Sequence, residues 1–166
     1  MVQYKIRACT QADIDILVEI IQNAFRDVAE RFGLTRENSP RHPSNCRADW
    51  LQRDMNRGIT YCLLNKDDQN VGCAALEQVS NDLCYLERLA VIPAQRRQGL
   101  GAALVNHVLS AASALGVHRV EIGIIAEHKE LKEWYGKLGF VEMESKDFPH
   151  LLFRVTFMAY YLNQRR

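Results

Sequence analysis

The stretch LERLAVIPAQRRQGLGAALVNHVL, residues 86–109, joins an apolar run to a helical pattern through a loop with two arginines and two glycines. The apolar run ends at Pro93, and apolar residues recur at helical spacing after Gly99. A helix N-terminus presents unpaired N–H groups and the positive end of the helix dipole, so it attracts an anion. The glycines leave the backbone accessible and the arginines add charge. The stretch therefore predicts a strand–loop–helix unit that binds a polyphosphate.

The spacing within this stretch excludes two common polyphosphate motifs. A dinucleotide fingerprint requires G-x-G-x-x-G, but Leu104 occupies the place of the third glycine. The GK[ST] ending of a P-loop is also absent. The ligand is therefore expected to be a polyphosphate of another class.

The rest of the chain predicts alternating strands and helices. Apolar alternation and turn residues predict strands at 3–8, 59–65, 70–79, 83–92, 118–125, 140–144 and 151–159. Helical spacing and end signals predict helices at 11–31, 46–57, from Gly99 to Gly116, and at 128–138. Thr10 is the expected N-cap of the first helix, and residues 33–45 form a loop. This order predicts a mixed sheet flanked by helices.

Composition places the chain among ordinary globular proteins. Its 166 residues are 48% hydrophobic and 25% charged, with a formal net charge of +1, and predict a single domain over residues 1–166. The near-neutral charge argues against a nucleic-acid binder that uses Arg96 and Arg97. Five scattered cysteines without C-x-x-C spacing predict free thiols in the cytoplasm and no metal site. No signal-peptide core or membrane-spanning run is visible, so no membrane partner is expected.

Two motifs resemble those of a known family. The run R-R-Q-G-L-G-A-A-L, preceded by L-A-V-I-P, is similar to the acetyl-CoA signature of the GNAT superfamily of N-acetyltransferases, and W-Y-G-K-L-G-F at 134–140 is similar to its second motif. Together they cover about residues 84–141, whereas the N-terminal half is similar in element order alone. The resemblance implies an α/β fold with a mixed, mostly antiparallel sheet of six to seven strands, about four helices, and a splayed central strand pair.

The resemblance implies a cofactor site for acetyl-CoA. Pantetheine would pair with the backbone between the strands at 84–92 and 118–125, and the N–H groups from Arg97 to Ala102 would bind the pyrophosphate. His128 stands where relatives often have an asparagine that contacts the cofactor, or it caps the following helix. The implied cofactor-binding residues are Leu89, Ala90, Val91, Arg96, Arg97, Gln98, Gly99, Leu100, Gly101, Ala102 and His128.

The resemblance also implies catalytic residues. Tyr135 matches the tyrosine that protonates the leaving thiolate in many members, or it is an aromatic that packs beside Trp134. Some members carry a base at the position of Gly123, and a glycine cannot serve. Glu87, on the strand at 83–91, is then the first candidate base, or else a solvated or salt-bridged carboxylate. Glu121 is the second candidate, and Glu77 is a more distant one.

The predicted function is transfer of an acetyl group from acetyl-CoA to a primary amine, either a small molecule or a peptide amino terminus. The alternative is a non-catalytic acyl-CoA-binding regulatory module on the same fold, which the glycine at position 123 keeps open. The apolar run at 150–162 is an internal strand, or it supplies a strand for a homodimer. No motif in the chain defines the acceptor.

Overall fold

The computed structural model describes residues 3–162, and its contacts group the chain into two compact units. The first unit comprises Met1–Glu77 and Leu86–Val108, and the second comprises Gln78–Tyr85 and Leu109–Arg166. The expectation of a single domain stays a prediction. Strand pairing gives the order β1-β2-β3-β4-β5-β7-β6, and β4 (Leu83–Val91) contributes residues to both units.

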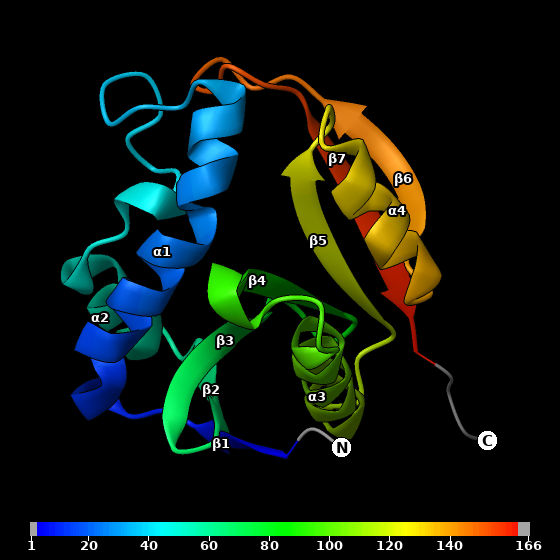
Figure 1. Ribbon diagram of the computed structural model, residues 1–166. Coiled ribbons are helices and arrows are strands. Elements are labelled where there is room, and N and C mark those ends of the chain that lie inside the picture. The colour runs from blue at the N-terminus through cyan, green and yellow to red at the C-terminus, as the bar shows by residue number, and fades with distance from the viewer. Residues whose placement is uncertain (1–2, 163–166) are drawn as a thin grey trace. The chain divides into compact units, whose positions relative to one another are not determined.

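A capping box precedes the first helix of the first unit, whereas the second helix begins without a side-chain cap. Thr10 and Asp13 form a capping box at the 3-10 turn η1 (Gln11–Asp13), and α1 follows over Ile14–Phe32. The 3-10 turn η2 (Pro43–Asn45) lies in the next loop, and α2 spans Ala48–Asn56. Figure 1 shows α1 and α2 packed side by side. The two apolar helix faces therefore form one surface that covers the neighbouring strands.

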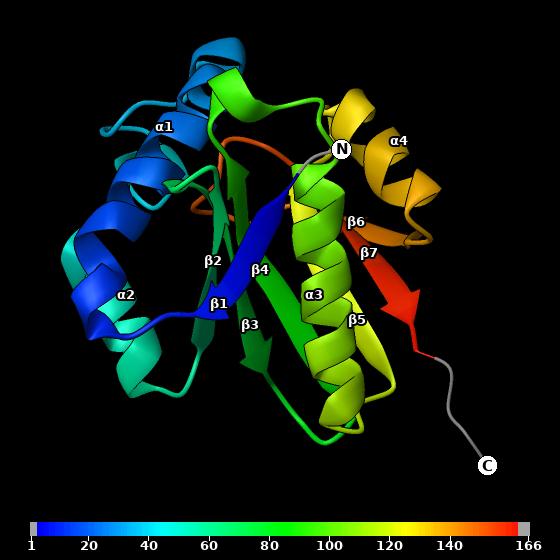
Figure 2. The same ribbon diagram turned by 60° about the horizontal axis from the view of Figure 1, so that its bottom comes forward.

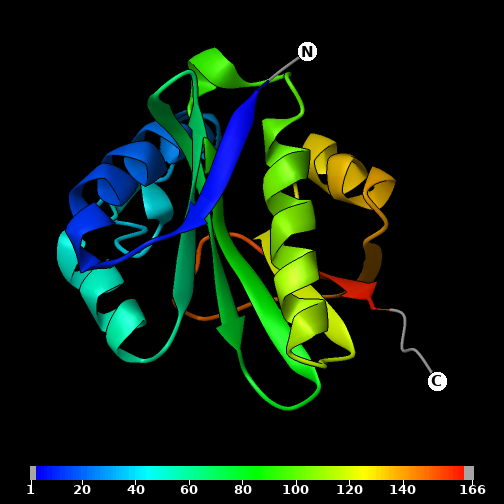
Figure 3. The same ribbon diagram turned by 90° about the horizontal axis from the view of Figure 1, so that it is seen from below.

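The strands of the first unit are covered on both faces. β1 (Tyr4–Ala8) and β3 (Gln69–Gln78) pair antiparallel with β2 (Thr60–Lys66). α1 and α2 lie on one side, where Tyr61 and Leu63 join the core. The first half of α3 (Leu100–Ala114) lies on the other side, as Figures 2 and 3 show. A Cβ on Gly72 would lie 3.1 Å from Leu104 Cδ1, so this glycine lets α3 approach closely.

The second unit is a smaller sheet with one helix. β5 (Arg119–Ile125) pairs antiparallel with β7 (Val155–Tyr161), and β7 pairs antiparallel with β6 (Val141–Lys146). At its other edge, β5 pairs in parallel with the start of β4, from Leu83↔Arg119 to Tyr85↔Glu121. α4 (Lys129–Lys137) lies beside these strands (Figure 1) and ends before Gly139, where φ is 107°.

The predicted fold class is confirmed, with seven strands and four α-helices in the predicted order within residues 3–162. The first predicted helix is divided, because the capping box starts a 3-10 turn before α1. The final strand was predicted from residue 151, but β7 begins at Val155. β7 pairs on both edges, with β5 and with β6, so the apolar run supplies an internal strand and no free edge for a dimer sheet. No helix within residues 3–162 is long and apolar enough to cross a membrane.

Candidate functional site

The loop between β4 and α3 has the backbone expected of an anion site. The turn η3 (Pro93–Gln95) follows the strand, and Arg97 and Gly99 adopt left-handed φ angles of 64° and 79°. Left-handed residues beside helical ones turn successive N–H groups toward one concave side. Leu100 is buried and fixes the start of α3, whereas Arg97, Gln98 and Gly99 are exposed. The start of α3 is therefore held in place by the buried Leu100, and the N–H groups before it are exposed to solvent.

Arg96 binds the protein itself. Its guanidinium donates to the Asp27 carboxylate at 2.7 Å and to the Ala24 carbonyl at 2.6 Å, both on α1. Its Nε donates to the Val91 carbonyl at the end of β4, at 3.2 Å. Through these hydrogen bonds, Arg96 holds the loop after β4 against α1. Positive charge at the exposed surface of the loop then comes from Arg97.

The end of β4 departs from regular strand geometry. Arg88 has a left-handed φ of 50°, which is uncommon for a residue with a Cβ and is typical of a bulge. Beyond it, Ala90 is buried in the core and Ile92 N–H donates to the Val71 carbonyl at 2.9 Å. The bulge changes which side chains and backbone groups β4 presents. The roles predicted for Leu89, Ala90 and Val91 toward pantetheine stay predictions.

Glu87 lies among charged groups of the first unit. Glu77, Asp54 and Arg88 are close enough to act on its carboxyl electrostatically. Burial, followed by the negative charge of Glu77 and hydrogen bonding with it, raises the pKa of Glu87 from 4.5 to about 7. A carboxyl with a pKa near neutrality exchanges a proton at neutral pH, so Glu87 has the properties of a general base.

Asp54 connects the groups around Glu87. Tyr61 donates a 2.6 Å hydrogen bond to the Asp54 carboxylate, and an Arg88 nitrogen lies 3.5 Å from the same oxygen. Trp50, one turn earlier on α2, has the Arg88 guanidinium 5.5 Å from its ring centroid. Sequence analysis identified none of these four residues as part of the site. The available signal was a carboxylate at position 54, three residues after the fully buried Leu51, on the apolar face of α2.

The second candidate base has a different environment. Glu121 accepts a 2.7 Å hydrogen bond from Arg119 Nε, and 13% of its side chain is exposed. The Glu121 carboxylate therefore already has a cationic hydrogen-bonding partner on the same strand. Gly123 faces β7, where an added Cβ would lie 3.3 Å from Val155 Cγ1 and 3.5 Å from the Phe157 ring. These contacts favour Glu87 over Glu121 as the base.

Tyr135 is buried in an aromatic cluster of the second unit. Its ring lies edge-on to Trp134 and to Phe140, with centroid distances of 5.0 Å and 5.2 Å. Burial raises the pKa of the phenol, so it stays protonated at neutral pH. Within residues 3–162 no hydrogen bond holds its hydroxyl. The ring is thus a packing residue, and its hydroxyl is still available to donate a proton.

Two histidines lie in loops that precede helices. His128 is the N-cap of α4, but its side chain makes no capping hydrogen bond, and Nδ1 lies 3.9 Å from the Glu130 carboxylate. Its predicted contact with the cofactor stays a prediction. His42, in the loop before α2, is buried beside Phe25, and its Nδ1 accepts from Ser44 N–H. His42 therefore stabilises the loop and is not a solvated side chain.

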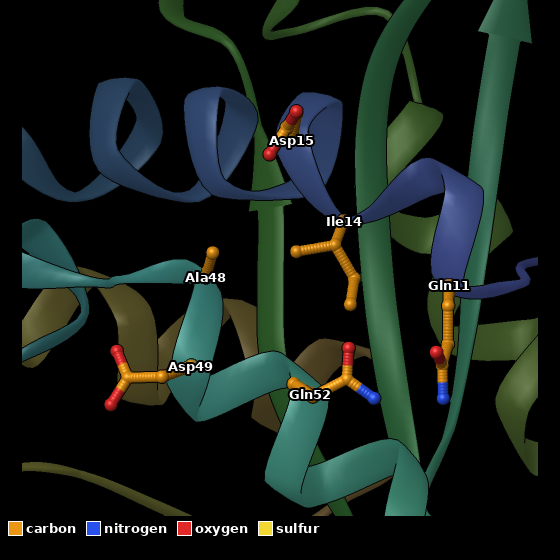
Figure 4. A pocket seen from close by; sticks show the side chains of 6 residues that line it. All are labelled: Gln11, Ile14, Asp15, Ala48, Asp49 and Gln52. Carbon is orange, nitrogen blue, oxygen red and sulfur yellow. The ribbon is translucent and has the colours of Figure 1, made fainter.

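A separate groove opens between the starts of α1 and α2. Figure 4 shows Ile14 and Gln52 pointing toward this space, which has a volume of about 390 Å³. Gln11, Asp15, Ala48 and Asp49 complete its lining. None of these residues belongs to the loop after β4 or to the cluster around Glu87. Among residues 3–162, no three His, Cys, Asp or Glu side chains converge as metal ligands.

Comparison with known proteins places this arrangement in a family. The model of the acetyltransferase (GNAT) family matches residues 19–140. An N-acetyltransferase of Methanocaldococcus jannaschii is 26% identical over 145 residues, which cover 85% of this chain and 62% of that protein. The chain thus spans less than two thirds of this curated relative.

Solved structures share the fold at low sequence identity. The ribosomal-protein-S18-alanine N-acetyltransferase of Escherichia coli superimposes with a TM-score of 0.78 and 18% identity, over 99% of this chain and 97% of that one. The yncA protein of Salmonella typhimurium, solved with its cofactor acetyl-CoA, gives a TM-score of 0.73 and 19% identity, over 99% and 96%. With the family match over most of its length, the chain belongs to the GNAT family of acetyltransferases.

Proposed function

We propose that the protein is an N-acetyltransferase that moves the acetyl group of acetyl-CoA to a primary amine. The observation that carries the proposal is the exposed loop after β4 (Leu83–Val91), whose left-handed backbone at Arg97 and Gly99 leads into the start of α3. The same strand carries Glu87, whose pKa burial raises to about 7. Family membership supports the same reaction. Both features lie within the first unit.

The loop fits the diphosphate of the cofactor. Left-handed backbone at Arg97 and Gly99 and the start of α3 provide N–H donors, and a Cβ on Gly99 would meet no atom within 4 Å, so the loop surface is open. The N–H groups from Arg97 to Ala102 bind the two phosphates, and Arg97 adds charge. When bound, acetyl-CoA supplies the acetyl thioester.

Glu87 is the proposed base that removes a proton from the acceptor amine. A primary amine is mostly protonated at neutral pH, and it must lose a proton before it attacks a carbonyl. With a pKa of about 7, Glu87 is ionised often enough to accept this proton and basic enough to hold it. The Glu121 carboxylate is instead hydrogen-bonded to Arg119.

Tyr135 is the proposed proton donor to the departing thiolate. Burial keeps the phenol protonated, and the contacts with Trp134 and Phe140 hold the ring in one orientation. The proton passes from the hydroxyl to sulfur as the carbon–sulfur bond breaks, and solvent returns a proton afterwards. Leu89, Ala90 and Val91 align the pantetheine arm, and His128 contacts the cofactor.

The acceptor is a small-molecule amine or a peptide amino terminus. Structural neighbours exist for both classes of acceptor. The Escherichia coli enzyme is named for an alanine of a ribosomal protein, whereas a Neisseria gonorrhoeae neighbour is an N-acetylglutamate synthase. All five cysteines are free thiols, which supports a location in the cytoplasm. The proposal includes a homodimer. Because both edges of β7 are paired within the chain, β7 does not join the sheets of the two subunits.

The test combines binding with turnover. Calorimetry with acetyl-CoA measures cofactor affinity, and release of free coenzyme A thiol is followed with amino acids, polyamines and peptides with free amino termini. We expect micromolar binding and thiol release with at least one acceptor class. Tight binding with no release over the whole panel would contradict the enzyme and favour a non-catalytic acyl-CoA-binding module.

A further inference from the structure

Arg88 differs from other ion-paired arginines of the chain. Three exposed arginines each donate two hydrogen bonds of 2.8–3.1 Å to one carboxylate, and these are Arg7, Arg47 and Arg154. The side chain of Arg88 is less exposed, at 22% against 54–68% for those three. Within residues 3–162, however, its guanidinium donates no hydrogen bond, and its ion pair with Asp54 spans 3.5 Å.

Asp54 does not satisfy the donors of Arg88. The 3.5 Å between Arg88 Nη2 and Asp54 Oδ2 is longer than a charge-assisted hydrogen bond, which spans about 2.7–2.9 Å. The same oxygen accepts the Tyr61 hydroxyl at 2.6 Å, and the other carboxylate oxygen lies 3.9 Å from Arg57. A guanidinium carries five N–H donors, and it is unfavourable to leave them unpaired in a partly buried position. These donors are therefore suited to a ligand.

The backbone and an aromatic ring hold the Arg88 guanidinium in place. Arg88 has a left-handed φ of 50°, and its carbonyl accepts from Cys73 Sγ at 3.7 Å. Its guanidinium lies 5.5 Å from the ring centroid of Trp50 on α2, within the range of a cation–π contact. Left-handed backbone is unfavourable for a residue with a Cβ, and such residues are concentrated at functional sites. The geometry thus presents a fixed, half-buried cation.

Arg88 directly follows Glu87, the proposed base. The Cα atoms of consecutive residues are about 3.8 Å apart. In a regular strand their side chains would point to opposite faces, but the left-handed φ of Arg88 interrupts this alternation. A base and a guanidinium at adjacent positions match a molecule that carries an amine and a carboxylate close together, because a guanidinium binds a carboxylate through two parallel hydrogen bonds.

We propose that Arg88 binds the carboxylate of the acceptor, so that the acceptor is a free amino acid. Arg88 is then a specificity-determining residue. It holds the carboxylate while Glu87 takes a proton from the amine of the same molecule, and Trp50 keeps the guanidinium in position. The inference rests on the proposed function, with Glu87 as the base.

The test compares amino acids with their amides, which keep the amine and lack the carboxylate. The parent enzyme should prefer the amino acid. R88Q should lower kcat/KM for the amino acid about tenfold or more, through KM, and change that for the amide less than about twofold. R88K keeps the charge without the fork and should give an intermediate loss. R53Q is the control on α2, because Arg53 pairs with Asp49 and should leave both substrates unaffected.

Thermal unfolding verifies that each variant is folded, and R88K provides the comparison if R88Q does not fold. A parent enzyme that uses amides as well as amino acids would overturn the inference without any variant. An unchanged ratio of amino acid to amide in R88Q would overturn it as well.

A binding measurement separates this inference from the proposed function. The chain has two tryptophans, so W134F leaves Trp50, the residue beside Arg88, as the one emitter. Its fluorescence is titrated with amino acids and amides in the presence of coenzyme A. A saturable change with an amino acid that is absent with its amide and lost in W134F/R88Q supports the carboxylate site.

The two proposals then fail in different ways. If amino acids bind through Arg88 but no amine releases thiol from acetyl-CoA, the carboxylate site stands and the proposed function fails. If thiol is released and no amino acid binds through Arg88, the proposed function stands and this inference is overturned. Absence of both binding and release contradicts both.

Discussion

Arg96, in the loop after β4, donates a 2.7 Å hydrogen bond to Asp27, which lies 69 positions earlier on α1. The same guanidinium reaches the carbonyl of Ala24 and, through Nε, that of Val91. An arginine in this motif would be expected to contact phosphate, but here it connects three backbone segments. The consequence is that the shape of the phosphate loop depends on α1.

This relationship gives a prediction for cofactor binding. D27A removes no group predicted to touch the cofactor, yet it should weaken acetyl-CoA binding about threefold to tenfold, because the loop loses its anchor. R96A should have a similar effect, and the double variant should lose less than the sum of the two. Calorimetry measures all three constants. Additive losses would show that Arg96 acts on phosphate directly.

The sequence predicted the loop but not this contact. Glycines, arginines and a helix start are local signals, and they gave the position of the anion site and the start of α3. The partner of Arg96 is fixed by how α1 packs in the first unit, and no spacing in the chain encodes a pair 69 residues apart. The motif therefore predicted the loop in which Arg96 lies, but not the groups that Arg96 contacts.

The candidate base shows the same limit. The family resemblance identified Glu87, but its pKa depends on Glu77 and Asp54, which come from β3 and α2. The left-handed φ of Arg88 interrupts the regular strand that was predicted over 83–92. The late start of β7 at Val155 has a similar origin, because the apolar residues 151–153 resemble a strand although they precede it. Tertiary packing, not local pattern, decides each of these features.

Glu87 should reduce stability at high pH. Its pKa is raised from 4.5 to about 7 in the folded protein, so between these values the native state binds more protons than the unfolded state. Stability then falls as pH rises through this window, and the cost is complete above it. E87Q should therefore raise Tm by a few degrees at pH 8 and by less at pH 5. Differential scanning calorimetry at the two pH values measures the difference, and an equal effect at both would contradict the raised pKa.

The hydroxyl of Tyr135 should affect turnover without affecting cofactor binding. Y135F keeps the ring contacts with Trp134 and Phe140 and removes the proton donor, so kcat should fall about 10²-fold while the Kd of acetyl-CoA stays nearly constant. Y160F is the control, since Tyr160 packs on Phe140 in the same cluster and also loses one hydroxyl. Stopped-flow thiol release measures both variants. Equal rates for Y135F and the parent would leave Tyr135 as a packing residue.

Gly99 offers a test of the phosphate loop that separates backbone strain from obstruction of the ligand. Its φ is 79°, so alanine there should cost about 1 kcal/mol, although a Cβ would meet no protein atom within 4 Å. Gly116 has a φ of 81° and equally open surroundings, but it ends α3 far along the chain from the loop. G99A and G116A should lower Tm alike, whereas G99A alone should weaken acetyl-CoA binding, by about tenfold or more, because its methyl group stands where the phosphates approach. If calorimetry shows the same cofactor affinity for both variants, the diphosphate does not lie on this loop.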